Sequence, residues 1–235
     1  MNNWNGYEVK NIKVNEHDAF IVCPKNPNGK WAIKTEYFEH FPDVQLKLLE
    51  MGYHIAHVIN ITRWHKKEDS DARAKLCEYM VKELGLDKKC SIIGMSCGGM
   101  QGIYFASYYP ELVNCLYLDA PVVNLLSCPG NVGKGKIGAL QEFTDATGMT
   151  MVDLLNYRNH PQDHIENLVK NNIPVIMVSG DSDTIVPYDE NGEILEKMYR
   201  ANGIEIEVHI KKGGDHHPHS LEDVTPIINF IEKHS

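Results

Sequence analysis

One serine in this chain has a sequence context typical of a nucleophile. Ser96 is the centre of Gly94-Met95-Ser96-Cys97-Gly98, which matches the pattern G-x-S-x-G. The apolar run 90–93 before it is typical of a buried strand, and residues 96–109 after it predict a helix. In a sharp strand-to-helix turn, glycines two residues to either side avoid Cβ clashes and leave the hydroxyl exposed above the sheet. The pattern alone also occurs in ordinary turns, but this context predicts a nucleophile.

Two polar clusters follow later strands in the chain order nucleophile, acid, base. The apolar run 173–179 ends in Gly180-Asp181-Ser182-Asp183, and the alternating run 204–210 is followed by Gly214-Asp215-His216-His217. Parallel strands present their carboxyl ends, and the loops after them, at one edge of a sheet. A histidine there can accept the serine proton near neutral pH, and a carboxylate can orient the histidine. The sequence therefore predicts a catalytic triad.

On these motifs the chain resembles the α/β-hydrolases, and among them the compact serine esterases. The resemblance runs from about Tyr53 onward and is loose over residues 1–52. It extends to a bacterial group of esterases associated with polysaccharide-degrading organisms, through Asp119-Ala120-Pro121-Val122, Pro129-Gly130 and the segments 186–191 and 216–223. It implies one α/β-hydrolase domain over 1–235, with a mostly parallel doubly wound sheet flanked by helices.

The resemblance implies that Ser96 is the nucleophile, Asp183 the orienting acid and His216 the base. Asp181 is the alternative acid, but in the family pattern the second aspartate of Gly-Asp-x-Asp belongs to the triad and the first braces the loop. The activity implied is hydrolysis of carboxylic esters without a cofactor.

His217 and His219 are alternative bases. The family histidine follows its glycine by two residues, which selects His216 after Gly214, and we expect His219 to pack or hydrogen-bond beneath the site. The same three histidines are also suitable zinc ligands, but neighbours on one loop rarely converge on a tetrahedral centre without a distant fourth ligand. We therefore predict no metal site.

The oxyanion of the tetrahedral intermediate requires hydrogen-bond donors placed in advance. The backbone amide of Cys97, next to Ser96 at a helix N-terminus, is the first predicted donor. The second donor usually follows the third strand. If that strand is 19–23, the donor lies near Lys25 or Asn26, within the loop 24–31, with Lys25 as the assigned residue.

Composition agrees with one enzyme domain. The 235 residues are enough for one large core, and the net charge of −9 provides no basic surface for nucleic acid or anionic lipid. We expect a small neutral or locally polar substrate; the oligomeric state is open. No apolar run approaches the ~20 residues of a membrane-spanning helix, and residues 1–6 do not resemble a signal peptide, so we expect a cytoplasmic protein unless a leader has been removed.

The six cysteines have no spacing typical of a zinc site or a disulfide framework, and we expect free thiols in a reducing compartment. Beyond the motifs, strands and helices alternate, which favours parallel strands with helical crossovers. We predict strands at 7–23, with a turn near 15–16, and at 54–59 and 113–118. We predict helices at 35–51, 70–84, 190–201 and 224–233.

Residues 121–161 do not continue this alternation. In α/β-hydrolases this part of the chain often carries an insertion over the active site, so we expect a small lid, or alternatively a surface loop with one helix. Within it, Gly130-Asn131-Val132-Gly133-Lys134-Gly135-Lys136 matches the start of a phosphate-binding loop, but Ile137 stands where that motif needs serine or threonine. Nucleotide binding is therefore not predicted.

The predicted function is a serine ester hydrolase that acts through an acyl-enzyme. Short acyl esters of carbohydrates are the leading substrates, followed by phenolic esters, and this choice rests on family analogy. Two alternatives remain: a serine peptidase or amidase with the same triad, and a non-catalytic binding module on the same fold.

Overall fold

The computed structural model describes residues 2–235 and contains one nine-stranded sheet. The strand order is β1-β2-β3-β5-β4-β6-β7-β8-β9. The strands from β5 to β9 along this order are parallel, and β1, β2 and β3 are joined to them in antiparallel pairs. The strands are β1 (Asn3–Trp4), β2 (Tyr7–Val14), β3 (His17–Cys23), β4 (Trp31–Lys34), β5 (His54–Val58), β6 (Cys90–Met95), β7 (Val113–Asp119), β8 (Val175–Gly180) and β9 (Ile206–Lys211).

Burial along each strand follows its place in the sheet. Every residue of β5, β6 and β8 is buried, because helices cover both faces of the central parallel strands. β2 lies near the antiparallel edge, and its buried residues Val9 and Val14 are separated by exposed and half-buried ones. The predicted α/β-hydrolase sheet is confirmed.

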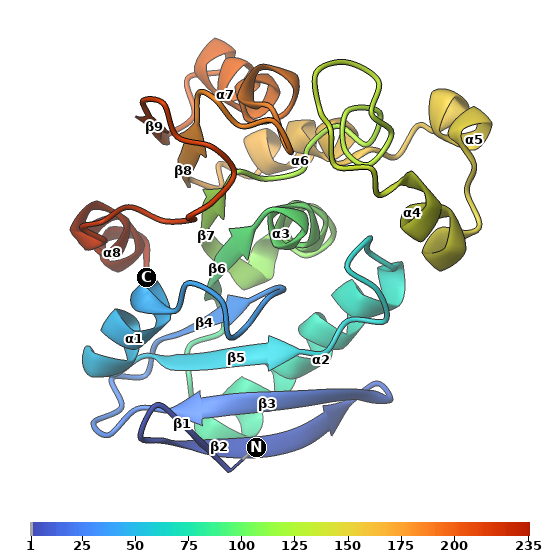
Figure 1. Ribbon diagram of the computed structural model, residues 1–235. Helices are drawn as coiled ribbons and strands as arrows, with labels where there is room; N and C mark the ends of the chain where they lie inside the picture. The colour runs from blue at the N-terminus through green and yellow to red at the C-terminus, as the bar shows by residue number, and fades with distance from the viewer. Residues whose placement is uncertain (1) are drawn as a thin grey trace.

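Helices form a layer on each face of the sheet (Figure 1). One layer contains α1 (Asp43–Glu50) and α8 (Thr225–His234), and the other contains α2 (Lys67–Leu84), α3 (Cys97–Tyr108), α6 (Ile165–Lys170) and α7 (Gly192–Ala201). Gly85, with φ of 65°, ends α2 as expected of a C-cap glycine. Short 3-10 helices cover Pro110–Leu112, Pro161–His164 and Tyr188–Glu190. Within residues 2–235, no helix is long and apolar enough to cross a membrane.

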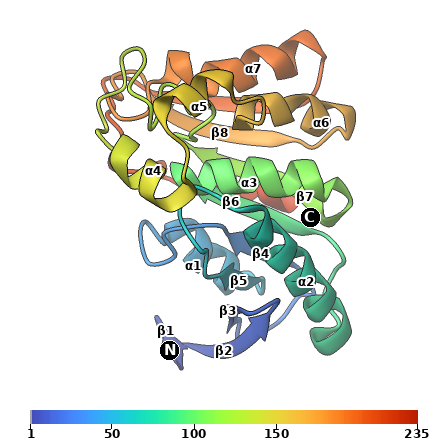
Figure 2. The ribbon, with the colours of Figure 1, turned by 90° about the vertical axis from the view of Figure 1, so that its right-hand side faces the viewer.

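The segment between β7 and α6 contains α4 (Leu140–Thr147) and α5 (Met151–Asn156). Figures 1 and 2 show both helices on the side of α3, further from the sheet than α3 itself. Phe143 of α4 is fully buried, and its ring lies 5.6 Å from that of Trp64. The insertion thus packs through an apolar cluster that it shares with Trp64 and with α3.

The structure differs from the predicted elements in one helix and in one additional strand. The helix expected over 35–51 is confined to α1, because residues 35–42 form an irregular loop in which Tyr37 and Phe41 have φ of 53° and 49°. The strand β4 was not predicted at all, and its position changes the assignment of one site residue.

Candidate active site

Ser96 lies at the turn between β6 and α3 with φ of 52° and ψ of −118°. Such a positive φ is uncommon for a non-glycine residue and occurs at strained functional turns. A Cβ on Gly94 would lie 2.7 Å from the carbonyl oxygen of Gly98, so the close approach of these two residues requires glycine. The Ser96 amide donates to the carbonyl of Asp119 on β7 at 2.8 Å, which fixes the turn to the neighbouring strand.

The structure brings the three predicted triad residues together. His216 Nε2 lies 3.1 Å from Ser96 Oγ, and His216 Nδ1 lies 2.7 Å from Asp183 Oδ2. The other carboxylate oxygen, Oδ1, accepts hydrogen bonds from the amides of Ile185 and Val186, both at 2.8 Å. All three triad side chains belong to buried residues, so this chain of hydrogen bonds is largely shielded from water.

The alternative acid and bases lie elsewhere. Asp181 is exposed, and its Oδ1 accepts from the Gly213 amide at 2.7 Å, which braces the loop after β9. His217 is exposed and its ring stacks beside Phe41. His219 is buried beneath the site, where its Nδ1 lies 2.6 Å from Asp119 Oδ1.

Asp119 and His219 form a second carboxylate–imidazole pair next to the first. Asp119 Oδ2 also accepts from the Ser220 amide at 2.6 Å and from the Tyr117 hydroxyl at 2.9 Å. The ring centroids of His219 and His216 are 4.8 Å apart. The loop that carries the triad histidine is therefore anchored to β7 directly below the site.

Of the two predicted oxyanion donors, the structure places one beside Ser96 and the other away from the site. The amide of Cys97 lies at the N-terminus of α3, immediately after Ser96, as expected. The prediction of Lys25 is wrong, because β3 runs antiparallel to β5 and its loop therefore lies at the opposite edge of the sheet from Ser96. The Lys25 ammonium lies 5.8 Å from the ring of Tyr7 instead.

β6 pairs with β7 on one side and with β4 on the other, and the loop after β4, Thr35–Tyr37, reaches the site. The Thr35 amide donates to the Ile93 carbonyl, and the Thr35 hydroxyl donates to the Gly98 carbonyl at 2.6 Å. A Cβ on Gly98 would lie 3.3 Å from the amide nitrogen of Glu36. The backbone amides of this loop thus lie beside the elbow.

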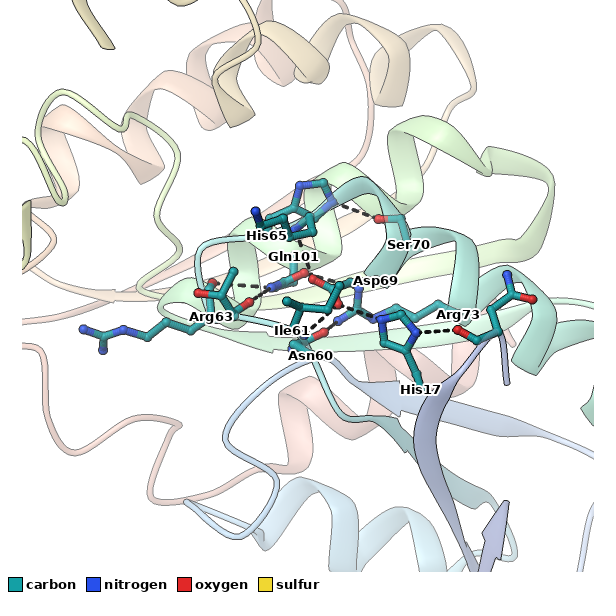
Figure 3. Close-up of polar contacts among 12 residues, drawn as sticks. His17, Asn60, Ile61, Arg63, His65, Asp69, Ser70, Arg73 and Gln101 are labelled. Atoms are coloured by element: carbon teal, nitrogen blue, oxygen red, sulfur yellow. Dashed lines mark hydrogen bonds and ion pairs between the residues drawn. The ribbon is translucent and has the colours of Figure 1, made fainter. Parts of the chain in front are cut away.

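A fully buried arginine holds this loop in place. Arg73 on α2 donates from Nη2 to the Thr35 carbonyl at 3.1 Å, and Asn60 Nδ2 donates to the same carbonyl at 2.7 Å. Arg73 Nη1 donates to Gln101 Oε1 at 3.3 Å, and Figure 3 shows Asn60 and Gln101 around the arginine. Burial lowers the pKa of Arg73 to about 10, which leaves it charged at neutral pH.

Sequence reasoning missed Arg73, although one signal was present. In the helix predicted over 70–84, residues 72, 76, 77 and 80 define an apolar face, and Arg73 belongs to the same buried face. A charged residue on such a face needs buried partners.

A pocket of about 540 Å³ opens above Ser96. Its apolar lining includes Phe41, Ile137 and Ile185, and its polar lining includes Tyr37 and Arg63. Burial raises the pKa of Tyr37, with the Cys97 thiol adding to the effect and Arg63 opposing it, so the phenol is neutral at physiological pH. Burial also raises the pKa of the Cys97 thiol to about 11.

Arg63 connects the pocket to the insertion. Its Nε donates to Glu142 Oε1 of α4 at 2.6 Å, its Nη2 contacts Glu142 Oε2, and Trp64 Nε1 donates to Glu142 Oε1 at 3.0 Å. Arg63 lines the pocket, and the carboxylate of Glu142 therefore neutralises much of the positive charge that Arg63 brings to it.

The Gly130–Lys136 segment has no features of a phosphate site. It neither follows a strand nor opens a helix. The ammonium of Lys134 pairs with Asp189, and its amide donates to Glu190 Oε1 at 2.7 Å. These partners are carboxylates, so the segment faces negative charge.

Comparison with known proteins agrees with this geometry. A mostly parallel sheet of this order, with a serine elbow and a histidine–carboxylate pair at the same edge, defines a serine hydrolase of the α/β-hydrolase type. The sequence model of the prolyl oligopeptidase family matches residues 52–235, and the chain belongs to that family. No curated protein sequence matches the chain.

Several solved structures share the fold at low sequence identity. Acylaminoacyl peptidase from Pyrococcus horikoshii is 17% identical with a TM-score of 0.72, over 90% of this chain and 38% of that one. Dipeptidyl peptidase 4 from Porphyromonas gingivalis is 16% identical with a TM-score of 0.73, over 99% and 36%. Est1E from Butyrivibrio proteoclasticus is 18% identical with a TM-score of 0.67, over 96% and 98%. The chain thus spans under two fifths of the length of these two peptidases and nearly all of Est1E.

Proposed function

We propose that this protein hydrolyses small carboxylic esters, with Ser96 as nucleophile, His216 as base and Asp183 as orienting acid. The observation that carries the proposal is the continuous hydrogen-bond chain from Ser96 Oγ through His216 to Asp183. Because Asp183 accepts from Nδ1–H, His216 keeps the tautomer whose Nε2 lone pair faces the serine.

The reaction takes two steps through an acyl-enzyme. Ser96 Oγ attacks the ester carbonyl while His216 Nε2 accepts the hydroxyl proton, and the resulting imidazolium then protonates the departing alcohol. His216 next takes a proton from water, which attacks the acyl-enzyme and releases the acid. No cofactor takes part in either step.

Two backbone amides hold the oxyanion in this proposal. One is that of Cys97, and the other is the Glu36 amide in the Thr35–Tyr37 loop, since the Thr35 amide donates to the Ile93 carbonyl and the Tyr37 amide donates to Glu36 Oε1 at 3.4 Å. Loss of one such donor typically costs on the order of 10²–10³ in kcat.

The pocket supports a small substrate with a short acyl or phenolic group. Its volume of about 540 Å³ lies within the usual range for small-molecule sites. Phe41, Ile137 and Ile185 offer an apolar surface to the acyl or aromatic group, while Tyr37 and Arg63 offer donors to a polar alcohol such as a sugar. In this proposal the insertion acts as a lid, since Ile137 and the Glu142 partner of Arg63 both belong to it.

A peptidase or amidase is the second candidate, favoured by the family to which the chain belongs and by the peptidases among its structural neighbours. The same triad serves amide bonds, which need stronger protonation of the leaving amine. A non-catalytic binding module is the least favoured alternative, because such modules commonly lack a triad residue. We also propose a reducing compartment such as the cytoplasm, supported by six free cysteines.

The test compares 4-nitrophenyl acetate, longer acyl homologues and matched 4-nitroanilides as substrates. We expect faster turnover of short esters than of anilides, and its loss in Ser96→Ala and His216→Ala. Faster anilide turnover would favour the peptidase, and ester hydrolysis that survives Ser96→Ala would refute the proposed mechanism. His209→Ala is the control, because His209 is half-buried on the edge strand β9 and pairs with Glu207, outside the site.

A further inference from the structure

Three histidine rings cluster at the wall of the pocket. The centroids of His216, His217 and His219 lie 4.8 to 4.9 Å from one another, and the rings are inclined at 66° to 89°. One ring nitrogen from each residue lies within 4.8 Å of those of the other two. The proline between His217 and His219 and the anchoring of the loop to β7 keep this arrangement compact.

Carboxylates orient two of the three rings. Asp183 Oδ2 lies 2.7 Å from Nδ1 of His216, and Asp119 Oδ1 lies 2.6 Å from Nδ1 of His219. Histidines that bind metals are usually held in this way, with the non-ligating nitrogen bound to a carboxylate. In His216 and His219 this leaves Nε2 as the available ligand atom, and no carboxylate binds either ring nitrogen of the exposed His217 among the described contacts.

We propose that His216, His217 and His219 form an inhibitory site for Zn²⁺ and chemically similar transition-metal ions. Tetrahedral zinc with Zn–N distances of about 2.0–2.1 Å places its nitrogens about 3.3 Å apart. The three nitrogens must therefore approach by at most about 1.5 Å, and rotation of the exposed His217 side chain supplies most of that change. Ser96 Oγ or water completes the coordination.

Metal binding at this site blocks catalysis directly. The lone pair of His216 Nε2 that accepts the Ser96 proton is the same lone pair that binds the metal. Arg63, which also lines the pocket, opposes a cation, but Glu142 neutralises much of its charge. Imidazole ligands favour Zn²⁺, Cu²⁺ and Ni²⁺, whereas Mg²⁺ and Ca²⁺ prefer oxygen, so the latter two do not inhibit.

The first test measures binding without turnover, so that it does not depend on the proposed function. Calorimetric titration of Ser96→Ala with Zn²⁺ is expected to show one site, since Ser96 is replaceable by water. His217→Ala is expected to weaken binding at least about tenfold, because loss of even an outer-shell partner commonly costs 10–100-fold. His209→Ala replaces a histidine outside the cluster and is expected to bind like the unaltered chain.

The second test follows ester hydrolysis, with each variant normalised to its own metal-free rate. Zn²⁺ is expected to inhibit reversibly, with recovery on addition of EDTA and a raised inhibition constant in His217→Ala but not in His209→Ala. Equal affinity of His217→Ala and the unaltered chain in the titration would overturn the proposal, as would the absence of heat with Zn²⁺. If no ester is turned over, the titration alone decides the metal site.

Discussion

The substitution Asp183→Asn tests how the carboxylate sets the tautomer of His216. In the native chain, Asp183 Oδ1 accepts from two backbone amides at 2.8 Å, and Oδ2 accepts from His216 Nδ1. An asparagine at this position keeps its oxygen toward the two amides, because the reverse orientation would leave two buried donors unpaired at about 1–3 kcal/mol each. Its NH₂ group therefore faces His216.

The consequence is a change of tautomer. His216 Nδ1 must then accept from the asparagine, so the ring proton moves to Nε2 and points at Ser96, and the base cannot accept the serine proton. We expect kcat to fall by about 10⁴-fold at neutral pH, which is about 5.5 kcal/mol of transition-state stabilisation. The fold remains, since shape and the two backbone hydrogen bonds are retained.

The assay is hydrolysis of 4-nitrophenyl acetate with a thermal unfolding curve for each variant. Asp181→Asn is the matched control, because Asp181 is exposed and its carboxylate bonds only within the loops. We expect its activity to change by about twofold or less, as is usual for exposed substitutions within ±0.5 kcal/mol. A folded Asp183→Asn protein with kcat within about tenfold of the native value would refute the tautomer argument.

Three further predictions concern stability, measured by urea unfolding. Arg73→Met should lower the unfolding free energy by about 3–5 kcal/mol, because the buried carboxylate of Asp69, that of Glu36 and the Thr35 carbonyl lose a buried charged partner. A loss below about 1 kcal/mol would contradict the role of Arg73 in holding the loop. Phe143→Ala should cost about 3–5 kcal/mol by opening a cavity against Trp64, and unchanged stability would mean that the insertion does not pack as described. Burial lowers the pKa of His57 to about 4, below its value of 6.5 in the unfolded chain. The stability that the neutral imidazole contributes is therefore fully present above pH 6.5 and is lost as the pH falls toward 4. The total loss of unfolding free energy is about 3 kcal/mol. His57→Asn should remove that part of the acid sensitivity, and an identical pH dependence in the variant would disprove the assignment.

The parts of the site that were predictable depend on local sequence. Gly94 and Gly98 permit the close backbone packing around Ser96, and the later clusters directly follow the apolar strand β8 and the alternating strand β9. The order of the clusters along the chain then places the serine, acid and base at the carboxyl ends of three parallel strands, β6, β8 and β9. The same reasoning anticipated that His219 would hydrogen-bond beneath the site, as its contact with Asp119 confirms.

The missed strand β4 has only four residues, shorter than the usual five or six, and ends in a lysine. A lysine ordinarily marks an exposed position, but Lys34 is fully buried, donates to Gln45 Oε1 at 2.7 Å and contacts the carbonyl of His40. Burial lowers its pKa to about 7. A single sequence does not distinguish such a lysine from a solvated one, because its partners come from a loop and a helix later in the chain.

The wrong assignment of Lys25 results from that missed strand and from the order of strands in space. Counting along the chain makes β3 the third strand, whereas in the sheet β4 lies between β5 and β6 and therefore next to the elbow. The proposed second oxyanion donor thus depends on a crossover, and the loop proposed to supply it is fixed by Arg73 and Asn60 from two other segments. The triad residues directly follow their strands, so sequence motifs predicted them. The proposed oxyanion hole depends on which strands are neighbours in the sheet, so the motifs predicted its Cys97 donor and missed the donor from the loop after β4.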